Sequence, residues 1–189
     1  MESKVKLAGH PVHPMLIAFP LGLLSTAVVF DIIYLITGNV RWTEMAYYLI
    51  GAGVIGGIAA AVPGWVDWAA IPGGTRAKRV GLVHGVGNVI VLALFVLSWL
   101  LRRPDPAASP TGAIVAALAG FVIVAGTGWL GGELVHRLSV GVDDGAHLDA
   151  PSSLSALPAA ATTRVAGDRR ASSQPAYAGI ERRAGGSVR

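Results

Sequence analysis

Four long apolar segments occupy most of the chain between residues 13 and 132, and short polar stretches separate them. They run from about 13 to 38, 45 to 66, 80 to 101 and 112 to 132, and the first carries a single charge, Asp31. An α-helix of about 20 residues spans the roughly 30 Å hydrocarbon core of a bilayer. The pattern therefore predicts four transmembrane helices.

The polar connections at residues 38–44, 67–79 and 102–111 are short. Short loops join antiparallel neighbours, so we expect an all-α integral membrane protein, a four-helix up-down-up-down bundle. Tryptophan and tyrosine are enriched where helices leave the membrane, and the aromatic residues near the segment ends support these boundaries. They are Trp42, Tyr47, Tyr48, Trp65, Trp68, Trp99 and Trp129.

Small residues recur at helical spacing in the second and fourth segments. Gly53 and Gly57 are four residues apart, which predicts close approach of another helix. We expect Pro63 to kink or end the second helix and to leave a backbone carbonyl in need of another donor. The fourth segment offers three further glycines for close contact: Gly120, Gly128 and Gly132.

Composition agrees with a membrane location. Hydrophobic residues make up 53% and charged residues 14% of the chain, with a mean hydropathy of +0.59. Soluble proteins average about 25% charged residues. The chain has no cysteine, which excludes disulfides, thiolate iron–sulfur ligation and c-type haem attachment. Any cofactor must be held by histidine, carboxylate, amide or backbone groups.

The net charge of +4 comes largely from arginines in the C-terminal region and from short juxtamembrane clusters. Such clusters fit an anionic lipid surface rather than nucleic acid. Residues 149–189 are rich in Ala, Ser, Pro, Gly and Arg without helical periodicity. We therefore expect a four-helix transmembrane domain over 1–148 and a disordered basic tail over 149–189.

Four spans place both termini and the middle loop on one side of the membrane. Basic residues near the membrane are more numerous on that side than on the other, so the positive-inside rule predicts cytoplasmic termini. The first side carries Lys4, Lys6, Arg76, Lys78, Arg79 and Arg137, and the second carries Arg41, Arg102 and Arg103.

Polar residues of the types that commonly bind cofactors gather on the same side of the membrane as the termini. His10 and His13 precede the first segment, Asp67 follows the second, and His84 lies one turn into the third with Asn88 four residues later. Histidine is uncommon in membrane segments and marks candidate sites there. The sequence predicts cofactor binding by His10, His13, His84 and Asn88, or a metal ion held by the three histidines and Asp67.

Structural roles compete with these functional ones. The HPVHP sequence can serve only as a rigid entry to the first helix, because its prolines restrict the backbone. Glu133 and His136 follow the fourth segment and fit the headgroup region. Asp31, near the opposite membrane face, is expected to pair with Arg41 across the first loop, with a proton or ion relay as the alternative.

Three stretches resemble a known family. They are GHPVHPMLIAFPLGLL at 9–24, GWVDWAAIPGGTRAKRVGLVHGVGN at 64–88 and GWLGGELVHRLSVGVD at 128–143, together with Asp31. Over roughly residues 9 to 143 the chain resembles the bacterial membrane family catalogued as domain of unknown function 2231.

The resemblance implies a four-helix protein of a bacterial plasma membrane, and some relatives carry a Rieske-type domain, which this cysteine-free chain lacks. The five candidate positions match the family pattern. Relatives have tyrosine in place of His136, which argues against a ligand role there.

The leading functional hypothesis is a redox-associated membrane subunit rather than an enzyme, with b-type haem or a metal ion held by His84 and one of His10 or His13. All candidate ligands lie on one side, so this chain alone would not carry electrons across the bilayer. The expected partners are the lipid bilayer and either a second copy of the chain in a homo-oligomer or a redox partner, with no nucleic acid.

The alternatives are proton or small-solute transport, with Asp31 and Asp67 as relay groups, and a non-catalytic scaffold. No phosphate-binding glycine loop, nucleophile elbow or HExxH motif is present.

Overall fold

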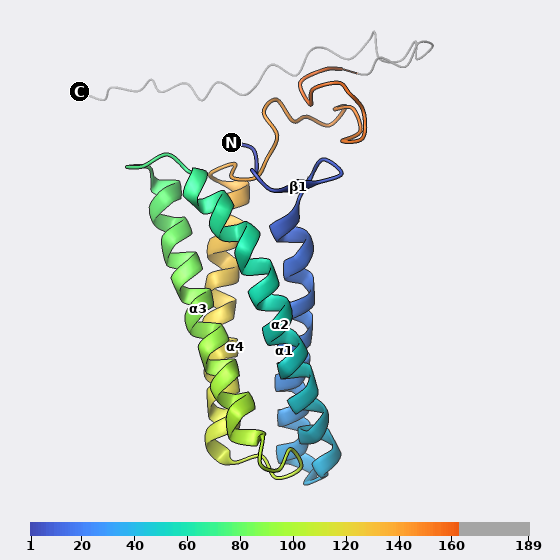
Figure 1. Cartoon of the computed structure of the whole chain (residues 1–189), viewed down its shortest axis with the longest axis vertical. Helices are drawn as coiled ribbons and strands as arrows, with labels where there is room; N and C mark the ends of the chain where they lie inside the picture. Colours follow the sequence, from blue (N-terminus) through green and yellow to red (C-terminus); the bar gives the residue numbers. More distant parts are fainter. Residues whose placement is uncertain (163–189) are drawn as a thin grey trace, which may run out of the picture.

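The computed structural model describes residues 1–162 and contains four long helices and one small hairpin (Figure 1). Of the tail predicted over 149–189, residues 163–189 lie outside the described residues, and residues 149–162 contain turns and bends without helix or strand. The elements are β1 (Lys6–Leu7), β2 (His10–Pro11), α1 (Val12–Thr37), α2 (Val40–Ala70), α3 (Arg76–Arg102) and α4 (Thr111–His136). All four helices are long and apolar enough to cross a membrane, which confirms the predicted all-α membrane bundle.

Consecutive helices run antiparallel, and α1 packs chiefly against α2, as α3 does against α4. The bundle is thus two helix hairpins side by side. The N-terminal segment, the α2–α3 loop and residues 137–162 lie at one end, called the upper end here after its place in Figure 1. The α1–α2 and α3–α4 loops lie at the other, lower end.

Helices α2 and α3 begin a few residues before the apolar segments, where polar side chains cap their first turns. Asn39 accepts a hydrogen bond from the Arg41 amide at 3.1 Å, and Thr75 accepts one from the Lys78 amide at 3.1 Å. Such caps accept hydrogen bonds from backbone N–H groups that have no partner within the first turn of a helix. Of the two outcomes expected for Pro63, termination is wrong, since α2 continues through this buried proline to Ala70.

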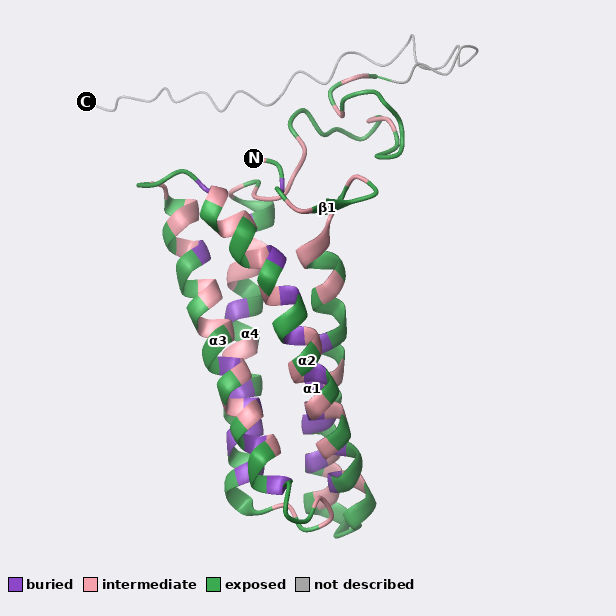
Figure 2. Cartoon of the chain, viewed as in Figure 1, coloured by how far each residue is buried: buried purple, intermediate pink, exposed green. Residues whose placement is uncertain are grey.

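Figure 2 shows that buried residues line the inner faces of the helices. Large apolar side chains such as those of Ile36 and Val122 are exposed. This is the arrangement expected for helices that face lipid. A Cβ added at Gly53 would lie 2.6 Å from Leu24 Cδ2, and one at Gly57 would lie 2.6 Å from Leu92 Cδ2. The predicted small-residue packing face on α2 is confirmed.

The glycines of α4 behave differently from one another. A Cβ at Gly120 would lie 2.9 Å from Phe95 Cε2, so close packing is confirmed there. Gly128 and Gly132 have no described neighbour within 4 Å of such an atom. The prediction of close contact at these two positions is wrong, because this end of the bundle encloses a cavity rather than a helix contact.

The predicted partner of Asp31 is also wrong. Both oxygens of its carboxylate bond to Arg102 of α3, with Nη1–Oδ1 and Nη2–Oδ2 distances of 2.7 Å, whereas Arg41 is exposed. Asp31 points into the bundle, so it meets the inward-facing arginine on α3 rather than the one near its own loop. Ser98 and Thr43 complete the network by bonding to the same guanidinium.

Candidate functional site

Two imidazoles face each other near the upper end of the bundle, one from each helix hairpin. His13 lies in the first turn of α1 and His84 about two turns into α3. Their ring centroids are 6.4 Å apart, and the ring planes are nearly perpendicular at 89°. Folding therefore brings together two of the histidines that the sequence analysis selected.

His13 is held by the backbone of α2. Its Nδ1 lies 2.7 Å from the carbonyl oxygen of Ala60. Pro63 has no N–H for the carbonyl four residues before it, so it frees the carbonyl of Ala59, and the acceptor of His13 is the next carbonyl along α2. Gly64 leaves room for the ring, because a Cβ there would lie 2.8 Å from His13 Nδ1. The contact of His13 with Ala60 therefore does not supply the donor expected for the carbonyl that Pro63 frees.

His84 is held in the same manner by α4. Its Nδ1 lies 2.8 Å from the carbonyl oxygen of Thr127. A Cβ at Gly131 would lie 3.1 Å from the ring, so glycine again provides clearance four residues after the acceptor. In each helix hairpin, an imidazole on the first helix thus bonds to a backbone carbonyl of the second helix. A glycine follows that carbonyl by four residues.

These contacts determine the tautomers. A carbonyl only accepts, so each ring carries its proton on Nδ1, which leaves a lone pair on Nε2. The Asn88 amide nitrogen lies 3.2 Å from His84 Nε2 and 3.5 Å from Nδ1, so it rests against the ring and not along the Nε2 lone pair. The Thr127 hydroxyl donates to Asn88 Oδ1 at 2.9 Å. On His13 no residue within 1–162 bonds to Nε2.

Both imidazoles line a cavity of about 410 Å³ between the helix hairpins, within the size range of small-molecule sites. A smaller cavity of about 110 Å³ continues from His84 and Asn88 towards the middle of the bundle. Glycine and apolar side chains form most of the wall of the larger cavity. Its glycines are Gly64, Gly81, Gly85, Gly128, Gly131, Gly132 and Gly141.

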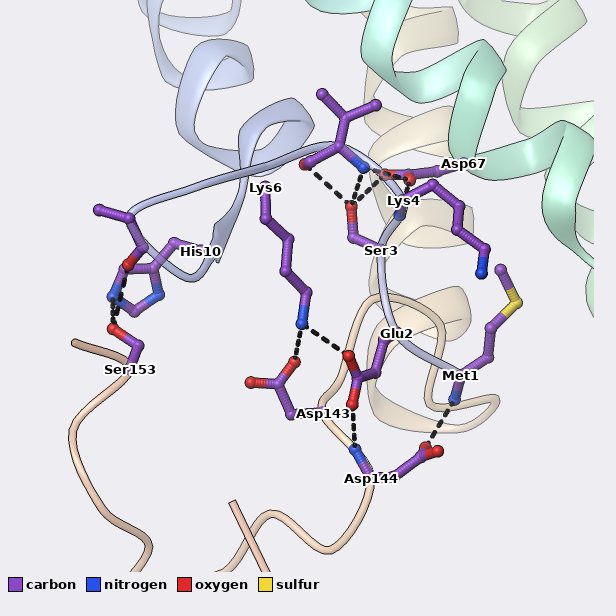
Figure 3. Close-up of polar contacts among 12 residues, drawn as sticks. Met1, Glu2, Ser3, Lys4, Lys6, His10, Asp67, Asp143, Asp144 and Ser153 are labelled. Carbon is purple, nitrogen blue, oxygen red and sulfur yellow. Dashed lines mark hydrogen bonds and ion pairs between the residues drawn. The ribbon is translucent and has the colours of Figure 1, made fainter. Parts of the chain in front are cut away.

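His10 lies apart from this pair. It is exposed on β2, its Nε2 lies 3.1 Å from the Ser153 hydroxyl, and it is not among the residues that line the cavity (Figure 3). Ala8 and Gly9, with φ of 50° and 80°, turn the chain between β1 and β2. This turn directs His10 towards the segment after α4, although only two residues separate it from His13.

Asp67 lines the cavity but is already engaged. Its carboxylate accepts hydrogen bonds from Ser3 Oγ at 2.7 Å and from the amides of Lys4 and Val5 at 2.6 and 3.3 Å (Figure 3). The side chain thereby fastens the N-terminal segment to the end of α2. A metal ion at Asp67 would have to compete with these three donors.

Charged contacts tie the same N-terminal segment to the chain after α4 (Figure 3). Lys6 Nζ lies 2.6 Å from Asp143 and 2.9 Å from Glu2. The hydrogen bond from Lys6 lowers the pKa of Glu2 below its ordinary value, and the bonds to Asp143 and Glu2 raise the pKa of Lys6. These pairs hold residues 1–11 beside Gly141, which lines the cavity.

Glu133 and His136 end in different surroundings. Glu133 forms an ion pair with Arg76 at 2.7 Å, which links α4 to α3, whereas His136 lines the cavity wall. Within residues 1–162 no three His, Asp or Glu side chains converge as a metal site. The polar groups that lie close to the imidazole pair are the Asn88 amide and the Thr127 hydroxyl, while Asp67 and His136 contribute elsewhere to the cavity wall.

Sequence reasoning missed Thr127, which belongs to this group. It is 5% exposed, it orients Asn88 through its hydroxyl, and its carbonyl accepts from His84. A signal was present in the sequence, because Thr127 is the one hydroxyl residue in the apolar stretch from Gly112 to Trp129. Such a residue in a membrane helix needs a partner.

A family model described as "Predicted membrane protein (DUF2231)" matches residues 9–144, which include every residue of the imidazole pair and its cavity contacts named above. No curated protein and no solved structure matches the chain. The matched range covers most of the sequence and all four helices, and so the chain belongs to the DUF2231 family of multi-pass membrane proteins.

Proposed function

We propose that this protein binds a redox cofactor in the cavity between its helix hairpins, and that the cofactor is b-type haem held through the imidazole pair. One observation carries the proposal. His13 and His84 donate from Nδ1 to carbonyls at 2.7 and 2.8 Å, with their ring centroids 6.4 Å apart. Metal-binding histidines commonly show this support, in which the far nitrogen is bonded and Nε2 keeps its lone pair.

The number of available ligands favours haem over a bare metal ion. A porphyrin supplies four ligands to its iron, so the protein needs only one or two axial imidazoles. A zinc ion, in contrast, takes three or four protein ligands. Asp67 was the expected oxygen ligand, and its carboxylate already accepts three hydrogen bonds. The apolar, glycine-lined wall also suits a flat hydrophobic ring.

The position of the imidazole pair determines from which side of the membrane a bound cofactor would exchange electrons. Both imidazoles lie near the upper end of the bundle, so electrons would be exchanged with a partner on that side of the membrane. A relay through Asp31 has less support, because both of its oxygens bond to Arg102 at the opposite end of the molecule.

The test is an absorption spectrum of the full-length protein, purified in detergent after expression with added haem precursor. We expect a Soret band that is abolished in the double variant His13→Ala/His84→Ala. His10→Ala and His147→Ala are matched controls, since both histidines lie outside the cavity lining, and they should retain the band. A wild-type protein that stays colourless after haem titration would refute the proposal.

A further inference from the structure

The two helix hairpins are built alike, and His13 and His84 occupy equivalent places in them. We infer that both imidazoles ligate the iron together, which makes the haem an electron carrier with no open position for a gaseous ligand. This inference rests on the proposed function, because it concerns haem in the same cavity. It adds the coordination state of the iron and the class of reaction that the site supports.

The hairpins repeat the contacts of the imidazoles. His13 Nδ1 lies 2.7 Å from the carbonyl oxygen of Ala60 in the first hairpin. His84 Nδ1 lies 2.8 Å from the carbonyl oxygen of Thr127 in the second hairpin. A glycine follows each carbonyl by four residues and lies close to the ring. Both hairpins therefore hold their imidazole in the same way.

The correspondence continues in the packing below the imidazoles. Leu24 packs on Gly53 in the first hairpin, where an added Cβ would lie 2.6 Å from the leucine Cδ2. Phe95 packs on Gly120 in the second hairpin, where an added Cβ would lie 2.9 Å from the phenylalanine Cε2. Leu24 and Phe95 each follow their imidazole by eleven residues, and each glycine precedes the acceptor carbonyl by seven. Helix α1 therefore corresponds to α3, and α2 to α4.

Equivalent residues of the two hairpins meet at two levels of the bundle. His13 and His84 face each other at the upper end, with ring centroids 6.4 Å apart. Asp31 and Arg102 follow these histidines by eighteen residues each and form an ion pair at 2.7 Å at the lower end. Residues related by a two-fold axis can touch each other only where they lie at that axis. Because α1 and α3 both run from the upper to the lower end (Figure 1), the two contacts define an approximate two-fold axis along the bundle.

The larger cavity lies on the same axis, because equivalent residues of both hairpins line it. Besides the histidines, these pairs include Leu21 and Leu92, Ala61 and Gly128, and Gly64 and Gly131. Asn88 is a polar exception, since its equivalent is Ile17. The Asn88 amide nitrogen lies 3.2 Å from His84 Nε2 and 3.5 Å from Nδ1, so it rests against the ring and does not occupy the Nε2 lone pair. Both imidazoles therefore keep Nε2 for a ligand on the axis.

An iron atom at the axis lies equally close to both imidazoles. A metal binds an imidazole nitrogen at about 2 Å, so two rings that share one metal atom have their centres roughly 6 Å apart. The observed separation of 6.4 Å agrees with this spacing. With both axial positions occupied, the iron can gain and lose electrons, whereas a gas can bind only after an imidazole leaves.

The experiment compares haem-loaded, full-length wild type with His13→Gly and His84→Gly, and with the controls His10→Ala and His147→Ala. The readouts are spin state from electron paramagnetic resonance and absorption, and the rate of carbon monoxide binding to the reduced protein. We expect wild type and both controls to be low-spin and to bind carbon monoxide slowly. His13→Gly and His84→Gly should each become high-spin and bind it at least tenfold faster, to a similar extent in the two variants.

Added imidazole separates loss of a ligand from loss of the fold. It should return both glycine variants to low spin, because glycine leaves the space of the missing ring open. Three results would overturn the inference and leave the haem proposal standing: a high-spin wild type, a glycine variant that stays low-spin without imidazole, or one that imidazole leaves high-spin. Failure of the wild type to take up haem would overturn both.

Discussion

Asp31 and Arg102 form a bidentate ion pair in which both side chains are completely buried, although they lie 71 positions apart in the sequence. The pair joins α1 to α3, and hence one helix hairpin to the other, at the lower end of the bundle. Thr43 of α2 bonds to the same guanidinium at 3.2 Å, and Ser98 bonds to the Ala113 carbonyl of α4 at 2.7 Å. One polar network therefore contacts all four helices.

Removing one partner of this pair should be costly. Asp31→Asn leaves a buried guanidinium without its counter-charge, and we expect a loss of about 3–5 kcal/mol in the free energy of unfolding. Combining Asp31→Leu with Arg102→Met should recover most of that loss, because no charge then remains. Arg41→Gln is the matched control and should stay within about 0.5 kcal/mol. Unfolding by a denaturing detergent measures all four proteins. Equal losses in Asp31→Asn and Arg41→Gln would contradict the role given to the pair.

Gly64→Ala tests the support of His13. The new Cβ would lie 2.8 Å from His13 Nδ1, so the ring must leave the Ala60 carbonyl or the helices must separate. We expect a destabilisation of about 1–3 kcal/mol, typical of overpacking, together with weaker haem binding. Gly132→Ala introduces the same atom where nothing lies within 4 Å, and it should be harmless. In a His13→Ala background the penalty should largely disappear, and a double-mutant cycle on unfolding measures this coupling. An undiminished penalty would show that the ring is not the obstacle.

Asp67→Asn should release the N-terminal segment. The carboxylate holds Ser3 and the amides of Lys4 and Val5, and a neutral amide group accepts such bonds less strongly. We expect amide hydrogen exchange at residues 4 and 5 to accelerate by at least tenfold, with the helices unaffected. Asp105→Asn, at the opposite end, should leave exchange at these positions unchanged. Unaltered exchange in Asp67→Asn would mean that other contacts hold the segment.

The ionic contacts of Lys6 predict a pH window for the same segment. The pKa of Glu2 is lowered from 4.5, so its contribution is present above that value and is lost as the pH falls through the folded-state pKa. The pKa of Lys6 is raised from 10.5, so its contribution is present below that value and is lost as the pH rises through the folded-state pKa. Attachment should be strongest between these limits. The rate of limited proteolysis within the N-terminal segment, followed across the pH range, measures this attachment. The Lys6→Met variant is the control for the pH dependence of the protease itself. Its cleavage rate should change less with pH than that of the wild type.

Much of the fold could be predicted from sequence because the relevant information is local. Apolar length identifies the four spans, and short loops determine that neighbours run antiparallel. Gly53 and Gly57 were recognised as a packing face since their spacing alone brings them to one side of α2. The starts of α2 and α3 were less predictable, because polar caps at Asn39 and Thr75 extend each helix before the apolar residues.

The candidate site was predictable only as a set of residue types on one side of the membrane. Folding brings His13, His84 and Asn88 to the wall of one cavity, whereas His10 turns away at the Ala8–Gly9 turn. Nothing in the spacing of the residues specifies the acceptor of each Nδ1. Thr127 joins the group from a helix that the sequence places 39 residues beyond Asn88.

The sequence by itself determined the membrane location, the four helices and the family, since these depend on hydrophobic length and on short motifs. The tertiary structure alone decided the partners of the buried polar groups: Arg102 rather than Arg41 for Asp31, and carbonyls of α2 and α4 for the imidazoles. Those choices depend on how each helix is rotated and how far it slides against its neighbours. Rotation and sliding are set by non-local packing, such as the fit of Leu24 against Gly53, and no local pattern in the sequence records it.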